Sequence, residues 1–219
     1  MEKLNKKLTI LVSTCDSYKD LWEPFYQCLT KYVLLDCDVV FVSESLKFNK
    51  FKTITPGFLP WGERNLIALE SIETDYILWL LEDYFYIRPL RKIDVLKYLK
   101  FIIDNDIDRL QISPDWHNED IYSFMNNKNQ LPLFKYSKVE SSIPYSVSLQ
   151  PSIWKKEYIM EILKKDYSPW DLEVKGSILN KSEKVFIDSS ITQHPYFNAV
   201  RKKNILNLSS IIKKIDKVI

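Results

Sequence analysis

The chain has 219 residues, of which 46% are hydrophobic and 27% charged, and its formal net charge is +2. This length fits one domain with a sizeable core, and the near-balanced charge provides no global field for binding nucleic acid. The chain has only 3 glycines, and neither G-x-G-x-x-G nor G-x-x-x-x-G-K occurs. A phosphate site in this protein must therefore use side chains or a metal ion rather than a glycine-rich loop.

The cysteines and the lengths of the apolar runs indicate in which cellular compartment the protein is found. Cys15, Cys28 and Cys37 lack metal-ligand spacing, and their odd number without a secretory signal favours a reducing environment. The first apolar run, 8–12, is too short for a signal peptide or a membrane span. We therefore expect a cytoplasmic protein. A helical repeat of leucine and isoleucine with lysines between them at 207–219 predicts a packed terminal helix, or a peripheral contact with the inner face of the membrane.

The order of the predicted elements indicates an open α/β sheet. Tyr76–Leu81 is a run of six apolar residues, which is typical of a strand buried on both faces of a parallel sheet. Strands alternate with helices in the first half, and a loop-rich half follows. The predicted strands are 8–13, 38–43, 51–54, 76–81, 110–113, 145–149 and 185–187. The predicted helices are 21–31 (capped by Ser17 or Asp20), 61–72, 94–103 (capped by Asp94), 156–165 and one that opens at 168.

Two carboxylates, Glu82 and Asp83, follow the strand at 76–81 directly. Ligands of open α/β sheets bind outside the carboxyl ends of the strands, so this pair is placed to hold a cation or a charged substrate. Because successive residues of a strand point to opposite faces, we expect only one of the two to enter the site, and we favour Asp83. Two solvated acids in a turn give the same pattern.

The end of the first strand carries Thr14, Asp16 and Tyr18. A strand-to-helix turn of this kind can hold a nucleobase, with Asp16 accepting hydrogen bonds and Tyr18 stacking. An Asx turn with a helix cap explains the same residues.

A predicted helix start after Pro169 carries Trp170, Asp171 and Glu173. Acidic residues in a first turn interact favourably with the helix dipole, which is the structural explanation. The functional explanation is a carboxylate base that takes a proton from an attacking hydroxyl, with Trp170 as a wall on which a sugar stacks.

Basic residues and a histidine near the C-terminus form a further candidate group. His194 could bind a metal ion or a phosphate, although a single histidine is more often structural. Arg201 and Lys202 could clamp a diphosphate, or could belong to a solvated run of charge.

Four stretches in order carry a family resemblance: residues 10–18, 61–64, 80–85, and 149–154 together with 168–173. On them the chain resembles small bacterial glycosyltransferases of the nucleotide-diphospho-sugar (GT-A) fold that build capsule and O-antigen polysaccharides. The resemblance implies a single GT-A-like domain over 1–219, an open mixed sheet flanked by helices. Residues 1–113 would form its nucleotide-sugar half, and 114–219 its acceptor half with the C-terminal helix.

The resemblance also implies roles for individual residues. Thr14, Asp16, Tyr18 and Arg64 would hold the nucleotide. The metal-binding D-x-D motif falls on Leu81–Asp83, where the first aspartate is missing. Mn²⁺ or Mg²⁺ would then bind Asp83, Glu82 and His194, or a metal-independent enzyme would use Arg201 and Lys202 instead. The base of an inverting enzyme would be Glu173, with Asp171 next. The acceptor side would include Gln150, Trp154 and Trp170.

The predicted function is transfer of a hexosyl or N-acetylhexosaminyl group from a nucleotide-diphospho-sugar such as a UDP-sugar. The acceptor would be a hydroxyl of a glycan or lipid-linked glycan, and the mechanism inverting, with a retaining one as the alternative. A second candidate is a sugar-phosphate nucleotidyltransferase, which usually has a glycine-rich N-terminal loop. A third is a non-catalytic module that binds a glycan or a nucleotide-sugar, which would account for the missing aspartate.

Overall fold

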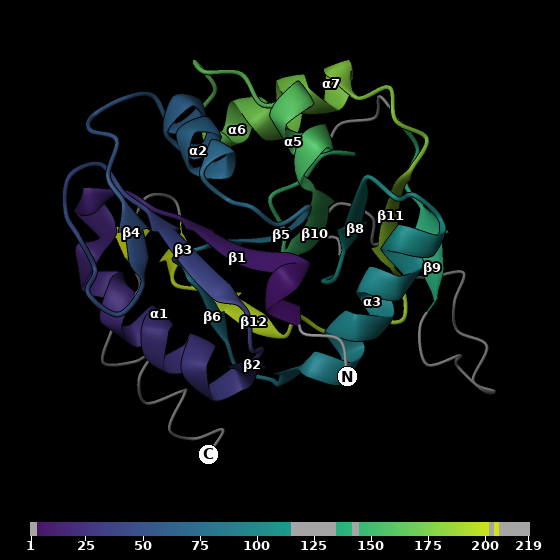
Figure 1. Ribbon diagram of the computed structural model, residues 1–219, viewed down its shortest axis with the longest axis horizontal. Helices are drawn as coiled ribbons and strands as arrows, with labels where there is room; N and C mark the ends of the chain where they lie inside the picture. Colours follow the sequence, from purple (N-terminus) through teal and green to yellow (C-terminus); the bar gives the residue numbers. More distant parts are fainter. Residues whose placement is uncertain (1–3, 115–134, 142–144, 202–203, 206–219) are drawn as a thin grey trace.

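An eight-stranded mixed sheet forms the centre of the protein in the computed structural model, which describes residues 4–114, 135–141, 145–201 and 204–205. The strands follow the order β4-β3-β1-β5-β10-β8-β11-β9, as Figure 1 shows. Their bounds are β1 Leu8–Ser13, β3 Asp38–Val42, β4 Lys52–Ile54, β5 Tyr76–Leu81, β8 Arg109–Gln111, β9 Tyr136–Lys138, β10 Ser152–Lys155 and β11 Val185–Asp188.

The first half of the sheet is parallel. β1 pairs in parallel with both β3 and β5, and β3 pairs in parallel with β4. β10 then runs antiparallel to β5 and to β8, and the pair β8–β11 is parallel again. The carboxyl ends of β1 and β5 lie side by side, since Ser13 is opposite Leu81. The predicted open mixed sheet is confirmed.

Helices cover both faces of the sheet (Figure 1). Alternate residues of the central strands enter two separate cores: Leu78 and Leu80 pack with α1 and α3, whereas Ile77 and Trp79 pack with α2 and α5. This period of two is the geometry of a strand buried on both faces. The helices are α1 Lys19–Tyr32, α2 Trp61–Glu70, α3 Lys92–Asp104, α5 Lys156–Ile162, α6 Pro169–Asp171 and α7 Ser177–Leu179, with short 3₁₀ turns η1 Leu4–Lys6 and η2 Asp16–Tyr18.

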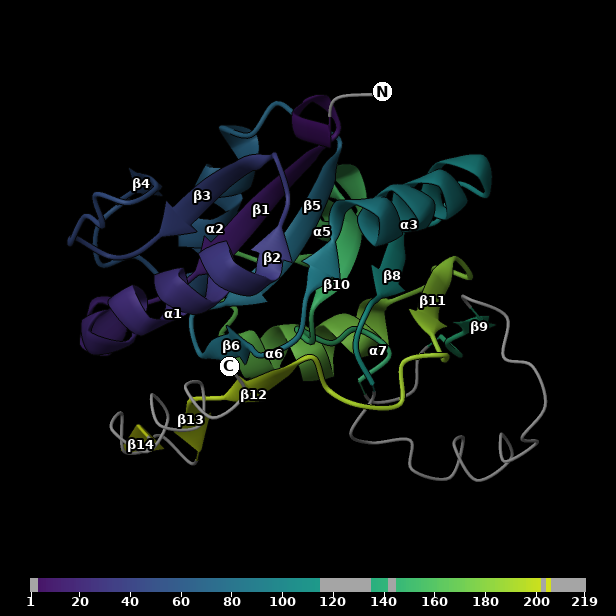
Figure 2. The same ribbon diagram turned by 90° about the horizontal axis from the view of Figure 1, so that it is seen from below.

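A π-helical turn, η3 (Leu172–Gly176), joins α6 to α7 without a break, so residues 169–179 form one continuous helical segment. Three two-stranded ribbons complete the fold, and the antiparallel pair β6–β12 runs below the sheet near α6 in Figure 2. Their strands are β2 Val33–Leu34, β6 Tyr84–Tyr86, β7 Leu90–Arg91, β12 Tyr196–Asn198, β13 Val200–Arg201 and β14 Asn204–Ile205.

The start of α2 packs directly on the chain that precedes α6. The backbone N–H of Gly62 donates to the carbonyl of Tyr167 at 2.9 Å, and that of Glu63 donates to Lys165 at 2.9 Å. A Cβ at position 62 would lie 2.0 Å from the carbonyl oxygen of Lys164, so only glycine permits this approach.

Several sequence predictions differ from the structure. Residues 145–149 are not a strand: they form a turn and an irregular segment, buried from Ser146 to Leu149, that ends before β10 begins at Ser152. The N-cap residues of α1 and α3 are Tyr18 and Arg91, neither of which makes a side-chain cap, so the predicted caps at Ser17, Asp20 and Asp94 are wrong. The predicted terminal helix at 207–219 lies outside the described residues.

Candidate active site

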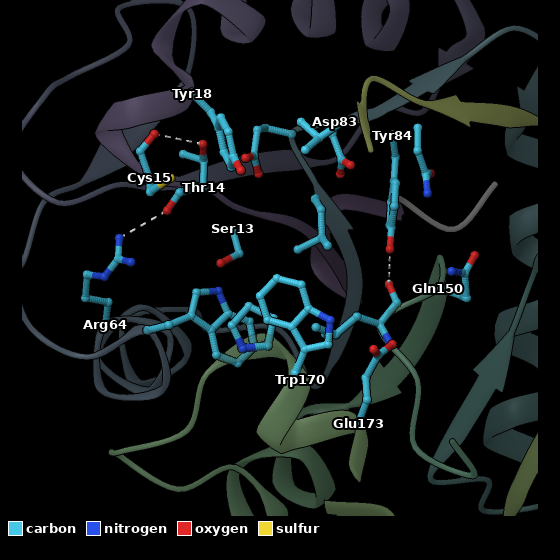
Figure 3. Close-up of a pocket in the computed structure, with 17 residues that line it drawn as sticks. Ser13, Thr14, Cys15, Tyr18, Arg64, Asp83, Tyr84, Gln150, Trp170 and Glu173 are labelled. Carbon is cyan, nitrogen blue, oxygen red and sulfur yellow. Dashed lines mark hydrogen bonds between the residues drawn. The ribbon is translucent and has the colours of Figure 1, made fainter. Parts of the chain in front are cut away.

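A cavity of about 780 Å³ opens at the carboxyl ends of β1 and β5. Its walls come from these strand ends, the first turns of α2, the segment 149–150, the helical segment 169–179, the start of β6, the end of β12 and the start of β13. Figure 3 shows Arg64 on one side, Asp83 and Tyr18 on a second, and Trp170 and Glu173 on the wall opposite Asp83. The place is the one at which open α/β sheets bind their ligands.

Glu82 and Asp83 both line this cavity. The expectation that only one would enter is wrong because β5 ends at Leu81, and the strand alternation does not extend into the turn before β6. Burial raises the pKa of Glu82 well above its usual range, and the charge of Asp83 raises it further. Burial also raises the pKa of Asp83, to about 7. The charge of Arg64 and a hydrogen bond with Thr14 lower the pKa of Glu82 only in part, so burial is the dominant effect.

The position of Asp83 is fixed by the chain after β12. The backbone carbonyl of Asp83 accepts the N–H of Ala199 at 2.8 Å. The backbone N–H of Val200 donates to the side-chain carboxylate of Asp83 and partly lowers its pKa. The residues that follow β12 therefore hold Asp83 in place at the cavity.

Thr14, Tyr18 and Arg64 meet at one end of the cavity. Arg64 is 5% exposed, its Nη1 donates to the carbonyl of Thr14 at 3.1 Å, and its Nη2 lies 3.2 Å from Oε1 of Glu44. The Thr14 hydroxyl accepts the indole N–H of Trp22 at 2.9 Å. These residues form the end of the cavity at which the sequence predicts nucleotide binding.

Asp16 does not line the cavity. Its carboxylate accepts backbone N–H groups from the loop after β3, among them those of Ser45 at 3.1 Å and Leu46 at 3.2 Å. The carboxylate of Asp16 therefore anchors that loop. Unlike Thr14 and Tyr18, Asp16 does not face the cavity, and its carboxylate oxygens already accept hydrogen bonds from the loop.

The two acids at the start of α6 have different surroundings. Asp171 forms a capping box with Ser168, accepting its backbone N–H at 2.9 Å, and pairs with Lys175 at 2.7 Å. The hydrogen bonds from Lys175 and Ser168 lower the pKa of Asp171. Asp171 does not line the cavity, so the structure gives it the capping role rather than that of a base.

Glu173 does line the cavity. Its Oε1 accepts the backbone N–H of Leu149 at 2.8 Å and the hydroxyl of Ser148 at 3.2 Å. Trp170 is 64% exposed beside it and presents an indole surface to the same space. A half-buried carboxylate and an exposed indole on one wall can receive a hydroxylated ligand.

Gln150 and Trp154, the other two residues predicted to bind the acceptor substrate, have different places in the structure. Gln150 lines the cavity, and its Oε1 accepts the hydroxyl of Tyr196. Trp154 is fully buried in β10, with its ring 6.4 Å from that of Trp79. The predicted contact of Trp154 with an acceptor is therefore wrong in this fold, since its side chain belongs to the core.

Three predicted residues remain: His194, Arg201 and Lys202. His194 packs edge-on against the ring of Tyr196, with 5.5 Å between centroids, and does not line the cavity. The backbone of Arg201 belongs to β13, whereas its side chain and all of Lys202 lie outside the described residues. Within the described ranges no three His, Cys, Asp or Glu side chains gather into a metal-binding group.

Sequence reasoning missed several lining residues: Ser13, Cys15, Tyr84 and Asn198. Ser13, Cys15 and Tyr84 neighbour residues that it did select, so proximity along the chain was the available signal. Asn198 reaches the cavity only because β12 pairs with β6, opposite Tyr84, and these two short strands have no clear signature in the sequence.

Comparisons with known proteins bear on the fold. No protein-family model and no curated protein matches the sequence. The structure is similar to S. aureus TarS 1–349 in complex with UDP-GlcNAc, with a TM-score of 0.56 and 16% identity over 93% of this chain and 61% of that chain. This chain thus spans about three fifths of the TarS fragment.

Two further solved structures are similar over nearly their whole length. One is CMP:2-keto-3-deoxy-manno-octonic acid synthetase complexed with CTP, with a TM-score of 0.51 and 12% identity over 97% of this chain and 98% of that one. The other is a cytidylyltransferase from Leptospira borgpetersenii, with a TM-score of 0.50 and 12% identity over 97% and 96%. At these identities the comparisons define the fold alone: the chain has a GT-A-like α/β fold.

Within the described residues, no helix combines the length and the apolar character that crossing a bilayer requires.

Proposed function

We propose that the chain is a glycosyltransferase that moves a sugar from a nucleotide-diphospho-sugar to a hydroxyl of a glycan or lipid-linked glycan, with inversion. One observation carries the proposal: Glu173 and the Glu82–Asp83 pair line the same cavity, with Glu173 on the wall opposite Asp83 (Figure 3). This arrangement separates a base from the place where a diphosphate would leave. The GT-A-like fold, shared with a TarS structure that contains UDP-GlcNAc, agrees with it.

In this mechanism Glu173 takes the proton of the acceptor hydroxyl. The hydroxyl oxygen bonds to the anomeric carbon while the bond from that carbon to the diphosphate oxygen breaks. The pair of electrons leaves with the nucleoside diphosphate. The two hydrogen bonds that Oε1 of Glu173 accepts favour the ionised form of this carboxylate before the reaction. Trp170 and Gln150, which line the same cavity, bind and orient the acceptor.

The pair at the end of β5 fits a divalent cation. Two adjacent carboxylates supply the oxygen ligands that Mn²⁺ and Mg²⁺ use, and because burial raises the pKa of both, a bound cation would stabilise their ionised forms. Glu82 and Asp83 would hold the ion, and the bound ion would neutralise charge on the diphosphate. Arg64, buried at the nucleotide end, adds positive charge to the same cavity.

The test is a thermal-shift screen with UDP-, GDP-, CMP- and dTDP-sugars, each with and without Mn²⁺. A ligand that binds the folded state raises the melting temperature, and we expect one nucleotide class to do so. The positive nucleotide is then incubated with glycan acceptors, and release of nucleoside diphosphate is measured. No shift with any nucleotide-sugar would contradict the proposal.

A sugar-phosphate nucleotidyltransferase is the second candidate, and the near-complete overlap with the two cytidylyltransferase structures favours it. That reaction starts from a nucleoside triphosphate and releases pyrophosphate, whereas glycosyl transfer releases a nucleoside diphosphate. Measuring both products separates the two. Binding of a nucleotide-sugar without either product would favour a non-catalytic binding module. A role in capsule or O-antigen synthesis remains the expectation from the sequence resemblance.

A further inference from the structure

The loop 146–149 is buried although it is neither helix nor strand. Ser146 is 1% exposed and Leu149 is 2% exposed. Buried backbone carbonyls and N–H groups outside regular structure need partners elsewhere. One side chain, Arg109, supplies two of them: Nη1 donates to the carbonyl of Ser146 at 3.2 Å, and Nη2 donates to the carbonyl of Ser148 at 2.8 Å.

Arg109 is itself held firmly. It is the first residue of β8, it is 1% exposed, and its guanidinium carbon lies 4.8 Å from the ring centre of Trp154. Its Nη2 also donates to Oε1 of Gln111 at 2.7 Å. A planar guanidinium fixed by stacking and by several hydrogen bonds has little freedom to turn.

The carbonyl of Ser148 and the N–H of Leu149 belong to one peptide group. Arg109 binds the oxygen end of this peptide, and Glu173 binds its N–H end at 2.8 Å. Because the peptide group is planar, fixing its oxygen also fixes the direction of its N–H. A cation at the oxygen and a carboxylate at the N–H polarise the same amide in the same sense, so the two interactions reinforce each other.

We infer that Arg109 is a positioning residue for Glu173, acting through the Ser148–Leu149 peptide although it does not line the cavity itself. The inference rests on the proposed function, in which Glu173 is the base. Arg109 orients the peptide that holds the carboxylate toward the acceptor and keeps that carboxylate ionised. Sequence analysis did not select Arg109, since its partners are 37 and 39 residues away along the chain.

The test compares Arg109→Met and Arg109→Lys with the unchanged protein in the transfer assay. We expect Arg109→Met to lower kcat about 10–100-fold while the KM for the nucleotide-sugar changes less than about threefold, in the range of misplaced catalytic groups. The acid limb of the pH profile of kcat should move to higher pH, because Glu173 loses a well-aligned hydrogen bond to its charged form. Arg109→Lys, which can still reach one carbonyl, should recover part of both effects.

Tyr98→Phe is the control, since Tyr98 is buried in the core on the other face of the sheet and donates to Asp188 at 2.9 Å. It should lower the melting temperature and leave the pH profile in place. If Arg109→Met does not fold, Arg109→Lys provides the same readouts. An unshifted acid limb with unchanged kcat in a folded Arg109 variant would overturn the inference.

A double variant separates this inference from the proposed function. If Arg109 acts through Glu173, then Arg109→Met should cost little further activity in the Glu173→Gln background. Additive losses would overturn the inference while leaving Glu173 as the base. Full activity of Glu173→Gln alone would instead contradict the assignment of the base in the proposed function.

Discussion

Glu82 and Asp83 are consecutive residues, yet both side chains line one cavity because the strand that precedes them ends at Leu81. Burial raises the pKa of each, and the proximity of Asp83 adds to the effect on Glu82. Burial and mutual repulsion therefore both oppose the ionisation of the pair. From this relationship we expect the stability of the protein to depend on pH and to respond to divalent cations.

The first prediction concerns pH. Between the ordinary pKa of 3.8 and the raised value of about 7, the folded protein keeps a proton on Asp83 that the unfolded chain has released. The folded state then binds more protons, so the free energy of unfolding falls as the pH rises through this window. We expect Asp83→Asn to flatten the slope and to raise the free energy of unfolding at pH 8 by about 1–2 kcal/mol.

Urea denaturation at pH 5 and pH 8 measures this effect. Asp171→Asn serves as the control of opposite sign: its pKa is lowered by Lys175 and Ser168, so removing its charge should destabilise the protein at pH 8. An Asp83→Asn protein with the same pH slope as the unchanged protein would refute the prediction.

The second prediction concerns divalent cations. Mn²⁺ at millimolar concentration should raise the melting temperature at pH 8 more than at pH 5, because protons compete for the same carboxylates. Glu82→Gln and Asp83→Asn should each abolish most of the increase. Equal shifts in both variants and in the unchanged protein would place the binding of the ion elsewhere.

The third prediction compares Trp154 and Trp170, two tryptophans that were both predicted from the sequence to bind the acceptor. Trp154→Ala removes a fully buried indole and should cost about 3–5 kcal/mol of unfolding free energy. Trp170→Ala removes one that is 64% exposed, so stability should change little while the KM for the acceptor rises. Chemical denaturation and acceptor kinetics on both variants provide the comparison, and an unchanged acceptor KM in Trp170→Ala would remove this residue from the binding wall.

The fourth prediction concerns the base. Glu173→Gln should lower kcat by about 10²–10⁴-fold with the binding of the nucleotide-sugar preserved, since only the proton acceptor is lost. Asp171→Asn, on the same helical segment but outside the cavity, should keep kcat within a few-fold. Single-turnover transfer and a thermal shift with the donor measure the two quantities. Equal losses in both variants would indicate that the helix, rather than the carboxylate, matters.

The fifth prediction uses Cys15 as a reporter of the cavity. Its thiol lines the cavity and is half-buried, and burial raises its pKa, so alkylation by iodoacetamide should be slow at pH 7 and faster above pH 9. A bound nucleotide-sugar should slow the reaction further. Mass spectrometry of the modified peptide separates Cys15 from Cys28 and Cys37, whose pKa values burial raises to about 11 and about 12. Labelling of Cys15 unaffected by a ligand that shifts the melting temperature would place that ligand outside this cavity.

The central sheet could be predicted because its strands carry local signals. Tyr76–Leu81 and Leu8–Ser13 were predicted with the bounds that the structure has, since continuous apolar runs ended by polar residues mark buried strands. The segment 145–149 misled the same reasoning: its alternation of serine with apolar residues resembles a half-buried strand. In the structure the carbonyls of Ser146 and Ser148 bind Arg109 instead of a neighbouring strand.

The site residues that could be predicted are those whose place in the sequence, next to a predicted strand end or helix start, is also the place where a ligand binds. Thr14, Asp83 and Glu173 follow strand ends or open a helix, and the structure places all three at the cavity. Asp16 has an equally suitable position, but its carboxylate is used by the loop after β3. Such use depends on contacts about 30 residues apart, and no local pattern reports it.

Gly62 has a consequence for the width of the cavity. The helix that carries Arg64 and the segment that leads to Trp170 touch main chain to main chain, with no side chain between them to compress or rotate. Any movement that opens one wall must therefore carry the other along, and the gap between them is set by hydrogen bonds of the backbone. A Cβ methyl group at position 62 would push these two segments apart. The absence of a side chain at this position therefore helps to set the size of the substrate that fits the cavity.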